Sequence, residues 1–484
     1  MIVEAIEMQG KLQSTDKTSV TFDFDSIIPK DHILKKIDKI IDFNLIRKIT
    51  EPCYCSNNGR PSIDPELFFR MLLIAYLYGI FSDRQLCKEI HFNIAYRWFC
   101  KLGLANKIPD HSSLTRIRDR LGINIFKEIF LNIIAQCKKL GLIKDIRIMT
   151  DGTLFQANAS LDSMIPRDKK VEHNLETNKI VPGIKPPKAR KITNKTYISN
   201  TDPDASLAFK HGTVRSLKYK NHLTIDADSR VILDTTITTG STHESQVYLD
   251  RVDTIEKEIS ITIQTAIADR AYGSGDIIQK LLDQNIKPNI PLFSGNSGKR
   301  DLVQEGFFYN KEHNYYICSQ GEILLPYPGI VNNVITFHTE GDACGSCLFK
   351  NNCTAKKYKN SSVRSVPHNV HKELFDMINK EMTTAPFRKN LSERMWKLEG
   401  LMSEIKLRHN MSRAKYRGIN KIQIQAYMAA YVINVKRIIA YIFIFIFMTT
   451  LLYIYLRWHA KYVKMKGFST GPRVFDNKNW PSRF

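Results

Sequence analysis

The hydrophobic periodicity of the chain changes near residue 145, and this change limits the folds that the sequence can adopt. Before that point, apolar residues recur at helical spacing, as in the stripe formed by Ile33, Ile37 and Ile41. After it, short β-rich runs alternate with helical runs in the order strand, hairpin, helix, strand, helix, strand. The sequence therefore predicts an all-α N-terminal part, followed by an α/β part built on a mixed sheet.

Three of the N-terminal helices have recognisable starting residues. The segment DPE at 64–66 supplies an N-cap, a proline at the first helical position and an acidic first turn. Residues 82–85, SDRQ, match a capping box, and Asp110 can cap a third helix. Short helices joined by tight turns are typical of a helix-turn-helix-like DNA-binding domain.

The charge of the chain favours a polyanionic partner. Its 484 residues include 71 Lys and Arg against 48 Asp and Glu, a formal net charge of +23. Such a surplus suits nucleic acid, because each neutralised phosphate releases condensed counterions; a membrane-facing surface is the alternative. The third helix carries Arg116, Arg118 and Arg120, which we expect to contact DNA, although a merely solvated basic face has the same spacing.

Two acids follow apolar runs in similar contexts. The run IRIMTD ends in Asp151, and TAIAD ends in Asp269. Ligands of α/β sheets gather beyond the carboxyl ends of strands, so the two carboxylates are candidate metal ligands. A later helix supplies Glu399, seven positions before Lys406 and therefore on the same helical face. Taken singly, an Asp at a strand end is more often a cap or turn residue.

Five blocks, in this order, resemble bacterial insertion-sequence transposases. Their helical N-terminal domain is similar to RPSIDPELFFRMLLIAYLYG…IPDHSSLTRIRDR. Successive blocks of their DDE catalytic domain resemble DGTLFQANAS, DPDAS…KYKNHLTID, IADRAYGS and WKLEGLMSEIKLRHNMSRAKYRGINKIQIQAYMAAYVINVKRI. The resemblance covers residues 26–438 and implies an RNase H-like mixed sheet with helices. THES at 242–245 departs from the family pattern, which leaves open whether this block supports the site.

The resemblance implies a catalytic triad of Asp151, Asp269 and Glu399. In-line displacement at phosphorus can use two Mg²⁺ (or Mn²⁺) ions, which prefer oxygen ligands, so three carboxylates suffice. Attack by water would expose a 3′-OH at the element end, and that 3′-OH would then attack target DNA. Phosphates beside the metals would be held by three basic residues, namely Lys406, Arg413 and Arg417.

The expected partners are double-stranded DNA, as terminal inverted repeats and target, and further copies of the chain on that DNA. The expected location is the bacterial cytoplasm, in association with the nucleoid, because the first residues lack a basic segment followed by an apolar core. Two alternatives remain open: an RNase H-like nuclease without strand transfer, and a DNA-binding derivative that has lost activity.

A segment of about ninety residues, 296–385, interrupts the α/β part and carries four cysteines. Cys318, Cys344, Cys347 and Cys353 match a Cys₄ structural zinc site in ligand type, although their spacing is not that of a two-knuckle ribbon. Four reduced, partly buried thiols are the alternative. We therefore expect a Cys-containing insertion with a possible Zn²⁺ site.

The end of the chain contains an uncharged run of 19 residues, Ile438–Leu456, which is long enough for a membrane helix. In a nucleic-acid enzyme we expect it to pack on the core or on a partner subunit; a membrane span or a decayed end are alternatives. The predicted divisions are a helical DNA-binding domain (1–140), the first catalytic part (141–295), the insertion (296–385), the final catalytic helices (386–438) and an apolar, basic tail (439–484).

Overall fold

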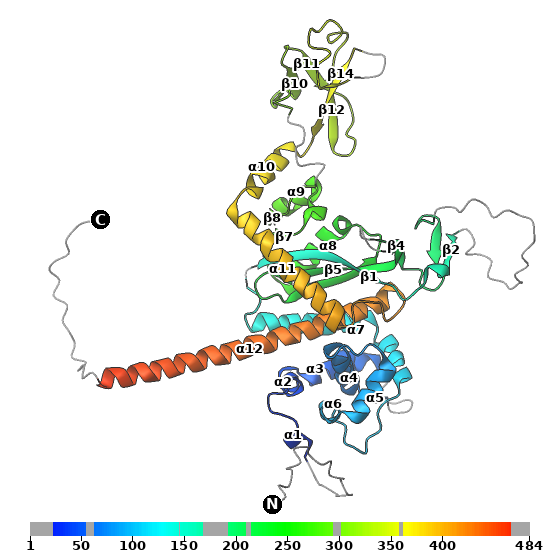
Figure 1. The fold of residues 1–484 in the computed structure, drawn as a ribbon, viewed down its shortest axis with the longest axis vertical. Helices are drawn as coiled ribbons and strands as arrows, with labels where there is room; N and C mark the ends of the chain where they lie inside the picture. The colour runs from blue at the N-terminus through cyan, green and yellow to red at the C-terminus, as the bar shows by residue number, and fades with distance from the viewer. Residues whose placement is uncertain are drawn as a thin grey trace, which may run out of the picture.

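The computed structural model describes residues 23–54, 62–144, 146–167, 192–209, 214–293, 302–357 and 362–465 (Figure 1). Asp64, Ser82 and Asp110 are the N-caps of α4, α5 and α7, so all three predicted helix starts are confirmed. The N-terminal helices are α1 (Phe24–Ile27), α2 (Ile33–Ile40), α3 (Phe43–Thr50), α4 (Pro65–Leu77), α5 (Asp83–Phe92), α6 (Ile94–Phe99) and α7 (His111–Lys139).

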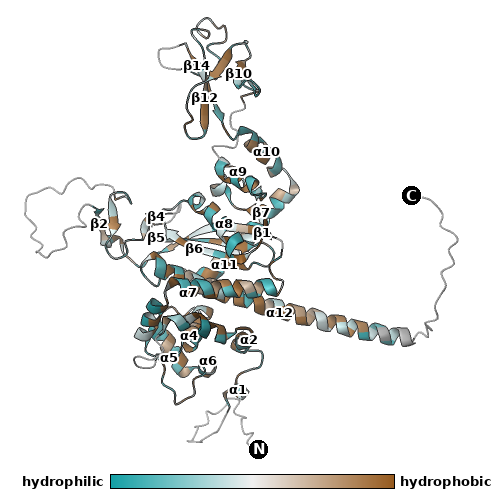
Figure 2. Ribbon diagram, turned by 180° about the vertical axis from the view of Figure 1, so that it is seen from behind, coloured by the Kyte–Doolittle hydropathy of each residue, from teal (hydrophilic) through white to brown (hydrophobic). Residues whose placement is uncertain are grey.

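A kink divides α7 at Gly122, whose φ of +66° and ψ of 177° are not helical. A positive φ is readily adopted only by glycine, because it has no Cβ atom. The residues before the kink pack among the N-terminal helices, whereas those after it run beneath the sheet beside α12 (Ile419–Met465) (Figure 2). The kink therefore lets one helix belong to both parts of the molecule.

The central sheet is mixed, as the sequence predicts. Its middle strand β1 (Ile146–Gln156) pairs antiparallel with β5 (Ser216–Asp226), which pairs antiparallel with β6 (Ile232–Thr239) and with the short β4 (Ser206–Ala208). On its other side β1 pairs parallel with β7 (Ile263–Ile267), and β7 with β8 (Lys287–Asn289). The helices α8 (Tyr248–Ile259) and α9 (Gly275–Asp283) make the crossovers that parallel pairing requires. Three antiparallel strands followed by two parallel ones form an RNase H-like sheet.

Helix α12 covers the outer edge of β6. Gln423 accepts a hydrogen bond from Ile237 N (2.7 Å) and donates one to Thr235 O (2.7 Å). Asn434 accepts from Ile232 N (2.8 Å) and donates to the carbonyl of the same residue (2.9 Å). Gln423 and Asn434 are eleven residues apart on the helix, a rise of about 16 Å, and Ile232 and Ile237 are five residues apart on the strand, a span of about the same length. The two amide side chains therefore lie opposite the backbone groups that they bind. They satisfy backbone groups that an uncovered edge strand would leave unpaired.

The N-terminal helices and the sheet share one hydrophobic core. Helix α11 (Ala385–Arg408) lies over β1, and the residues after it reach the end of α4. There His409 Nδ1 lies 2.6 Å from the Tyr76 carbonyl, and Asn410 donates to the Ala75 carbonyl at 3.2 Å. These side chains satisfy carbonyls at the C-terminus of α4, which have no partner within the helix. The helical part is thereby fixed to the part that contains the sheet.

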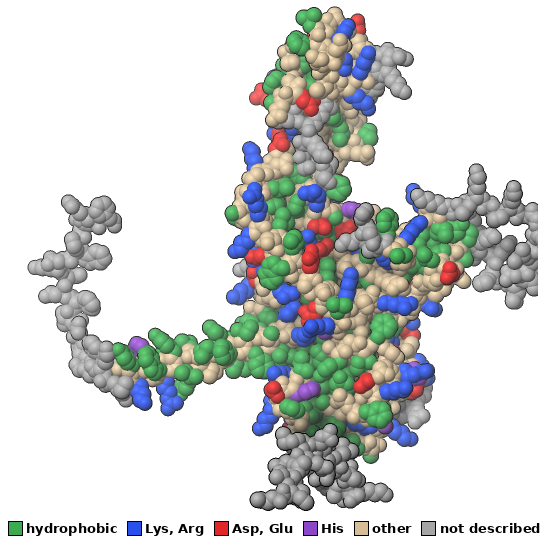
Figure 3. Space-filling view, in the orientation of Figure 1, with side chains coloured by type: hydrophobic (Ala, Val, Ile, Leu, Met, Phe, Trp, Pro, Cys, Tyr) green, Lys and Arg blue, Asp and Glu red, His purple; other side chains and the backbone are tan. Residues whose placement is uncertain are grey.

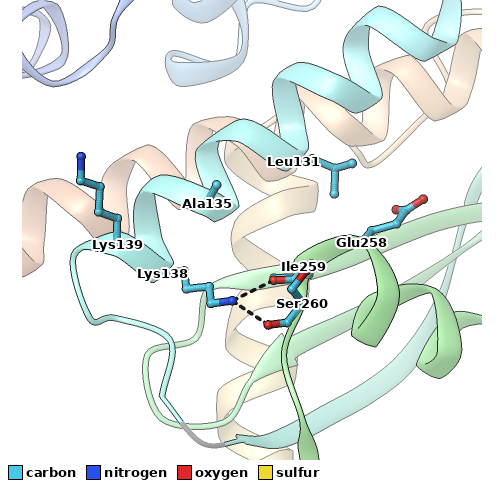
Figure 4. A pocket seen from close by; sticks show the side chains of 7 residues that line it. All are labelled: Leu131, Ala135, Lys138, Lys139, Glu258, Ile259 and Ser260. Carbon is cyan, nitrogen blue, oxygen red and sulfur yellow. Dashed lines mark hydrogen bonds between the residues drawn. The ribbon is translucent and has the colours of Figure 1, made fainter.

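A second contact of this kind borders a pocket of about 590 Å³ between α7 and the end of α8 (Figure 4). Lys138 donates to the carbonyls of Ile259 (3.1 Å) and Ser260 (2.6 Å). Ser260 is left-handed, with a φ of +54°, and ends α8. A cation at a helix C-terminus is favourable because the helix dipole is negative there. We assign Lys138 a structural role in joining α7 to α8.

The insertion forms its own antiparallel sheet beyond α9 and α10 (Lys372–Met382) (Figure 1). Its small core is separate from the main one. The strands lie in the order β13 (Lys356–Lys357), β14 (Arg364–Asn369), β12 (Val334–Thr339), β11 (Ile323–Pro326), β10 (Tyr315–Cys318) and β9 (Phe307–Asn310). The strands β2 (Met164–Pro166) and β3 (Tyr197–Ser199) form a separate two-stranded antiparallel ribbon, which belongs neither to the central sheet nor to the insertion sheet.

The apolar C-terminal run is a continuation of α12. Ile438 and Ile439 are buried, but from Phe443 onward the described side chains of the helix are exposed, and apolar side chains cover it (Figures 2 and 3). The prediction that the run packs on the core is therefore wrong beyond Ile442, whereas packing on a partner subunit stays a prediction. Within the described residues one helix, Ile419–His459, is long and apolar enough to cross a membrane.

Candidate functional site

The central sheet brings two of the predicted acids together. Strand β1 pairs with β7 up to Met149 and Ile267, and two residues further along each chain lie Asp151 and Asp269. Because adjacent strands are about 4.8 Å apart, the two carboxylates are neighbours at the point where β7 leaves the sheet. One expectation is corrected: β1 does not end at Asp151 but continues along β5 to Gln156, because Asp151 is paired with β5 within the ladder.

Asp151 is held by one backbone and one side-chain donor. Gly152 N donates to its Oδ1 at 2.7 Å, and Arg394 Nη1 from α11 donates to its Oδ2 at 2.8 Å. Burial raises the pKa of Asp151, the Arg394 charge lowers it and the Asp269 charge raises it, with a net upward shift. Asp269 caps the short helix η5 (Arg270–Tyr272) by accepting from Ala271 N at 2.8 Å. Arg394 is thus the cation that pairs with Asp151.

A third carboxylate, which the sequence analysis did not select, also approaches this pair. Glu244 lies in η4 (Glu244–Gln246), and a Cβ atom at Gly152 would be 3.0 Å from its Cγ and 3.1 Å from its Oε1. Burial raises the pKa of the Tyr272 phenol, and negative charges on Asp151, Asp269 and Glu244 raise it further. Lys220 Nζ lies 2.8 Å from Glu244 Oε1. The sequence signal that could have found Glu244 is its place in the THES block at 242–245, where this acid directly follows His243.

Glu399, the third predicted acid, is on helix α11. It lies between Arg394 and Lys406 along the helix, and its side chain is exposed. Among the described residues, no three His, Cys, Asp or Glu side chains are arranged closely enough to hold a metal ion. The structure therefore brings together two members of the predicted triad, and the role of Glu399 stays a prediction.

The three basic residues predicted to hold phosphates follow the second half of β1, beyond Asp151. Lys406 Nζ donates to the Leu154 carbonyl at 2.9 Å. Arg417 Nε donates to the Asn158 carbonyl at 3.2 Å, and Arg413 Nη2 lies 3.5 Å from the Asn158 Oδ1 atom. Arg413 and Arg417 are exposed. On the face drawn in Figure 3, Asp and Glu side chains gather near the middle, with Lys and Arg side chains around them.

The prediction that Arg118 contacts DNA is wrong. Its side chain is 2% exposed, its Nη2 lies 3.3 Å from Asp83 Oδ2, and its guanidinium stacks 4.5 Å from the Tyr416 ring. Arg118 lies on the buried face of α7, where an unpaired charge would be costly, and Asp83 supplies the partner. Arg116 and Arg120 are exposed on the opposite face and remain candidates for DNA contact.

The four cysteines of the insertion line one pocket, together with residues from β9, β11 and β14. All four are free, half-buried thiols. Burial raises the pKa of the Cys344 thiol, and charges on Cys353, Cys318 and Cys347 raise it further, whereas a contact with Thr339 lowers it. The structure thus groups the residues that the sequence selected as possible zinc ligands.

Known proteins place the chain in a family. A transposase domain model (DUF772) matches residues 22–120. No curated protein matches the chain. A piggyBac transposase synaptic complex with hairpin DNA is 10% identical, with a TM-score of 0.33, over 84% of this chain and 72% of that chain. A pre-cleavage Mos1 transpososome is 8% identical, with a TM-score of 0.16, over 49% of this chain and 61% of that chain.

These TM-scores are too low to support an argument, so the assignment rests on the family models and the sheet. The transposase DDE domain model matches residues 187–435, which is more than half of the chain. That range contains Asp269 and Glu399, whereas Asp151 lies before it on the strand that pairs with β7. With an RNase H-like sheet that carries adjacent acids, preceded by a transposase helical domain, the chain belongs to the DDE transposases.

Proposed function

We propose that this transposase binds the terminal inverted repeats of an insertion sequence, cleaves the DNA strand at the element end and joins that end to target DNA. The observation that carries the proposal is the adjacency of Asp151 and Asp269 at the edge of the β1–β7 pairing. The basic side chains of Lys406 and Arg417 bind backbone carbonyls further along the chain from Asp151, at Leu154 and Asn158, where they could also contact DNA phosphates.

The carboxylates fit a divalent cation by donor type, because Mg²⁺ and Mn²⁺ prefer oxygen ligands. Asp151 and Asp269, with Glu399 as the third acid, would hold it, and Arg394 would orient Asp151. When bound, such ions activate the attacking oxygen and stabilise the leaving one. The residues of the chain keep the carboxylates close together despite their mutual repulsion: the Gly152 and Ala271 amides and Arg394 each donate to one of them.

We propose further that the chain acts as a homo-oligomer on DNA in the cytoplasm, in association with the nucleoid. The exposed apolar half of α12 supports self-association, because a soluble chain rarely leaves so much apolar surface uncovered. The chain has 71 basic residues against 48 acidic ones, and this positive net charge supports a DNA partner.

A labelled duplex that carries the element end tests the proposal directly. With Mg²⁺ and a second duplex, we expect nicking at the element end, followed by covalent joining of that end to the second DNA. Nicking without joining would identify an RNase H-like nuclease instead. Binding without nicking, in Mg²⁺ and in Mn²⁺, would identify an inactive DNA-binding derivative.

The N-terminal arginines should separate DNA contact from stability. Replacing Arg116 and Arg120 together by Ala should weaken binding to the element end about tenfold and reduce its salt dependence, because both side chains are exposed cations. Arg118→Ala should instead lower the free energy of unfolding by about 2 kcal/mol, since the buried guanidinium loses its contacts with Asp83 and Tyr416, whereas Lys415 stays paired with Asp83.

Binding titrations at several salt concentrations and denaturant unfolding would measure the two effects. The control for lost charge is the double replacement of Lys257 and Lys280 by Ala, since both are exposed but lie on α8 and α9. If the control weakens binding as much as the Arg116 and Arg120 pair does, α7 is not the DNA-reading helix.

Arg394 should determine the pH below which cleavage activity is lost. Its charge lowers the pKa of Asp151, which burial otherwise raises. Arg394→Gln should therefore raise that pKa further, so the ionised, metal-binding form of Asp151 should be lost at a higher pH. The acid limb of the cleavage–pH profile should shift upward in this variant. Arg388→Gln, which removes an exposed charge from the same helix, should leave the profile unchanged; a shift of equal size there would contradict the specific role of Arg394.

A further inference from the structure

The insertion sheet has few residues with which to hold its shape. Its core consists of seven buried hydrophobic residues, whereas the main core joins the N-terminal helices to the central sheet. A core of this size is insufficient for a small structural unit without an additional cross-link. The connection from β12 to β13, residues 340–355, contains only turns and bends, and it leaves Leu348 93% exposed. Arg364 donates to the Lys350 (2.6 Å) and Ala355 (3.2 Å) carbonyls of this connection, and a further cross-link would stabilise it.

The four thiols lie where such a cross-link is needed. Cys318 is the last residue of β10, whereas Cys344, Cys347 and Cys353 belong to the connection between β12 and β13. All four line one pocket of about 170 Å³. Cys318 and Cys353 also pack against the small core. Residues that are distant in sequence thus meet at the junction between the loop and the sheet.

Each group of thiols is carried by a hydrogen-bonded turn. Gly345 N donates to the Asp342 carbonyl at 2.8 Å, within the turn that holds Cys344, and Lys350 N donates to the Cys347 carbonyl at 3.2 Å in the next turn. A Cβ atom at Gly345 would lie 2.5 Å from Asp342 Oδ1, so the Asp342 side chain lies directly against this turn. At the end of β10, Gly321 N donates to the Cys318 carbonyl at 2.9 Å. Two tight turns that each present thiols to a shared pocket are typical of structural metal sites with thiolate ligands.

We propose that Cys318, Cys344, Cys347 and Cys353 bind one structural zinc ion. Four thiolates select a soft or borderline metal, and tetrahedral sulfur coordination is characteristic of zinc. In the described chain the thiols surround the pocket without being placed as ligands of one ion, so binding turns them inward. The ion would tie the connection to β10 and would take no part in DNA cleavage. The site does not depend on the proposed function, because it shares no residue with Asp151 and Asp269.

The first experiment is metal analysis of the full-length chain, purified under reducing conditions without chelators. We expect about one zinc per chain, with Zn–S distances of ~2.3 Å by X-ray absorption spectroscopy. Cys347→Ser and Cys318→Ser should each lose most of the zinc. Cys53→Ser, which alters a half-buried thiol outside the insertion, should keep it. Absence of zinc from the unmodified chain, with all thiols reduced, would overturn the proposal even if a variant fails to fold.

The second experiment separates zinc binding from a disulfide or from adventitious binding. Replacing zinc by Co²⁺ should give the intense visible absorption of a tetrahedral thiolate site, and Cys347→Ser should abolish it. Chelation should make the insertion more sensitive to protease while the rest of the chain stays resistant, because structural zinc contributes folding energy locally. Octahedral cobalt spectra, or a disulfide among the four cysteines with no bound metal, would overturn the assignment.

Discussion

Asp269→Asn is expected to reduce cleavage of an element-end duplex by about a hundredfold or more while leaving DNA binding almost unchanged. The Asn side chain can still accept from Ala271 N, so the cap of η5 is kept and only the negative charge is lost. Loss of a metal ligand removes several kcal/mol of transition-state stabilisation, and each 1.4 kcal/mol corresponds to about tenfold in rate. Binding depends on basic residues elsewhere, so it should not change.

Single-turnover cleavage with saturating Mg²⁺ would measure this effect, with a binding titration beside it. Asp283→Asn is the matched control, because Asp283 is an exposed acid at the end of α9 and undergoes the same chemical change. Asp151→Asn should be equally inactive, although it also leaves Arg394 without its partner and is therefore a less clean test. Full cleavage by Asp269→Asn would contradict the site.

The third acid should be identified by a pair of variants. We expect Glu399→Gln to lose about a hundredfold in cleavage, whereas Glu244→Gln should retain most activity. Glu244 already has a structural partner in Lys220, and its charge balances that cation. The Glu399 side chain is exposed on the helix that carries Arg394 and Lys406 to β1, where DNA and metal can reach it. Both variants should bind the element end as the unmodified chain does.

The two replacements are the same chemical change, so each serves as the control for the other under identical Mg²⁺ and Mn²⁺ conditions. If Glu244→Gln is inactive and Glu399→Gln is active, the third ligand is the acid that the fold brings beside Gly152. In that case α11 would contribute Arg394 and Lys406 to the site but no metal ligand. If both variants keep full activity, the proposed three-carboxylate site is wrong.

Features that depend on neighbouring residues could be predicted from the sequence. Asp64, Ser82 and Asp110 cap their helices through hydrogen bonds to backbone amides two or three residues away, so the local pattern was sufficient. The change from helical to strand periodicity predicted the change from helices to a sheet, because apolar residues recur at different spacings in the two structures. Asp151 and Asp269 were selected because each follows an apolar run in the sequence, whereas the continuation of β1 to Gln156 could not be predicted from these runs.

Features that depend on distant residues were decided only by the tertiary structure. Arg116, Arg118 and Arg120 look alike in the sequence, but Arg118 is buried because Asp83 and Tyr416 lie against it in the folded chain. Glu244 reaches Gly152 only because β1 and η4 come together there.

The sequence by itself determined the helix starts and the strand pattern, since short-range hydrogen bonding and periodicity specify them, and it selected two of the acids and the four cysteines as candidates. The tertiary structure decided which charges are buried, which acid approaches the pair and where the apolar end of α12 lies. Those outcomes depend on desolvation and on charge partners that come from other parts of the chain, and no local pattern encodes them.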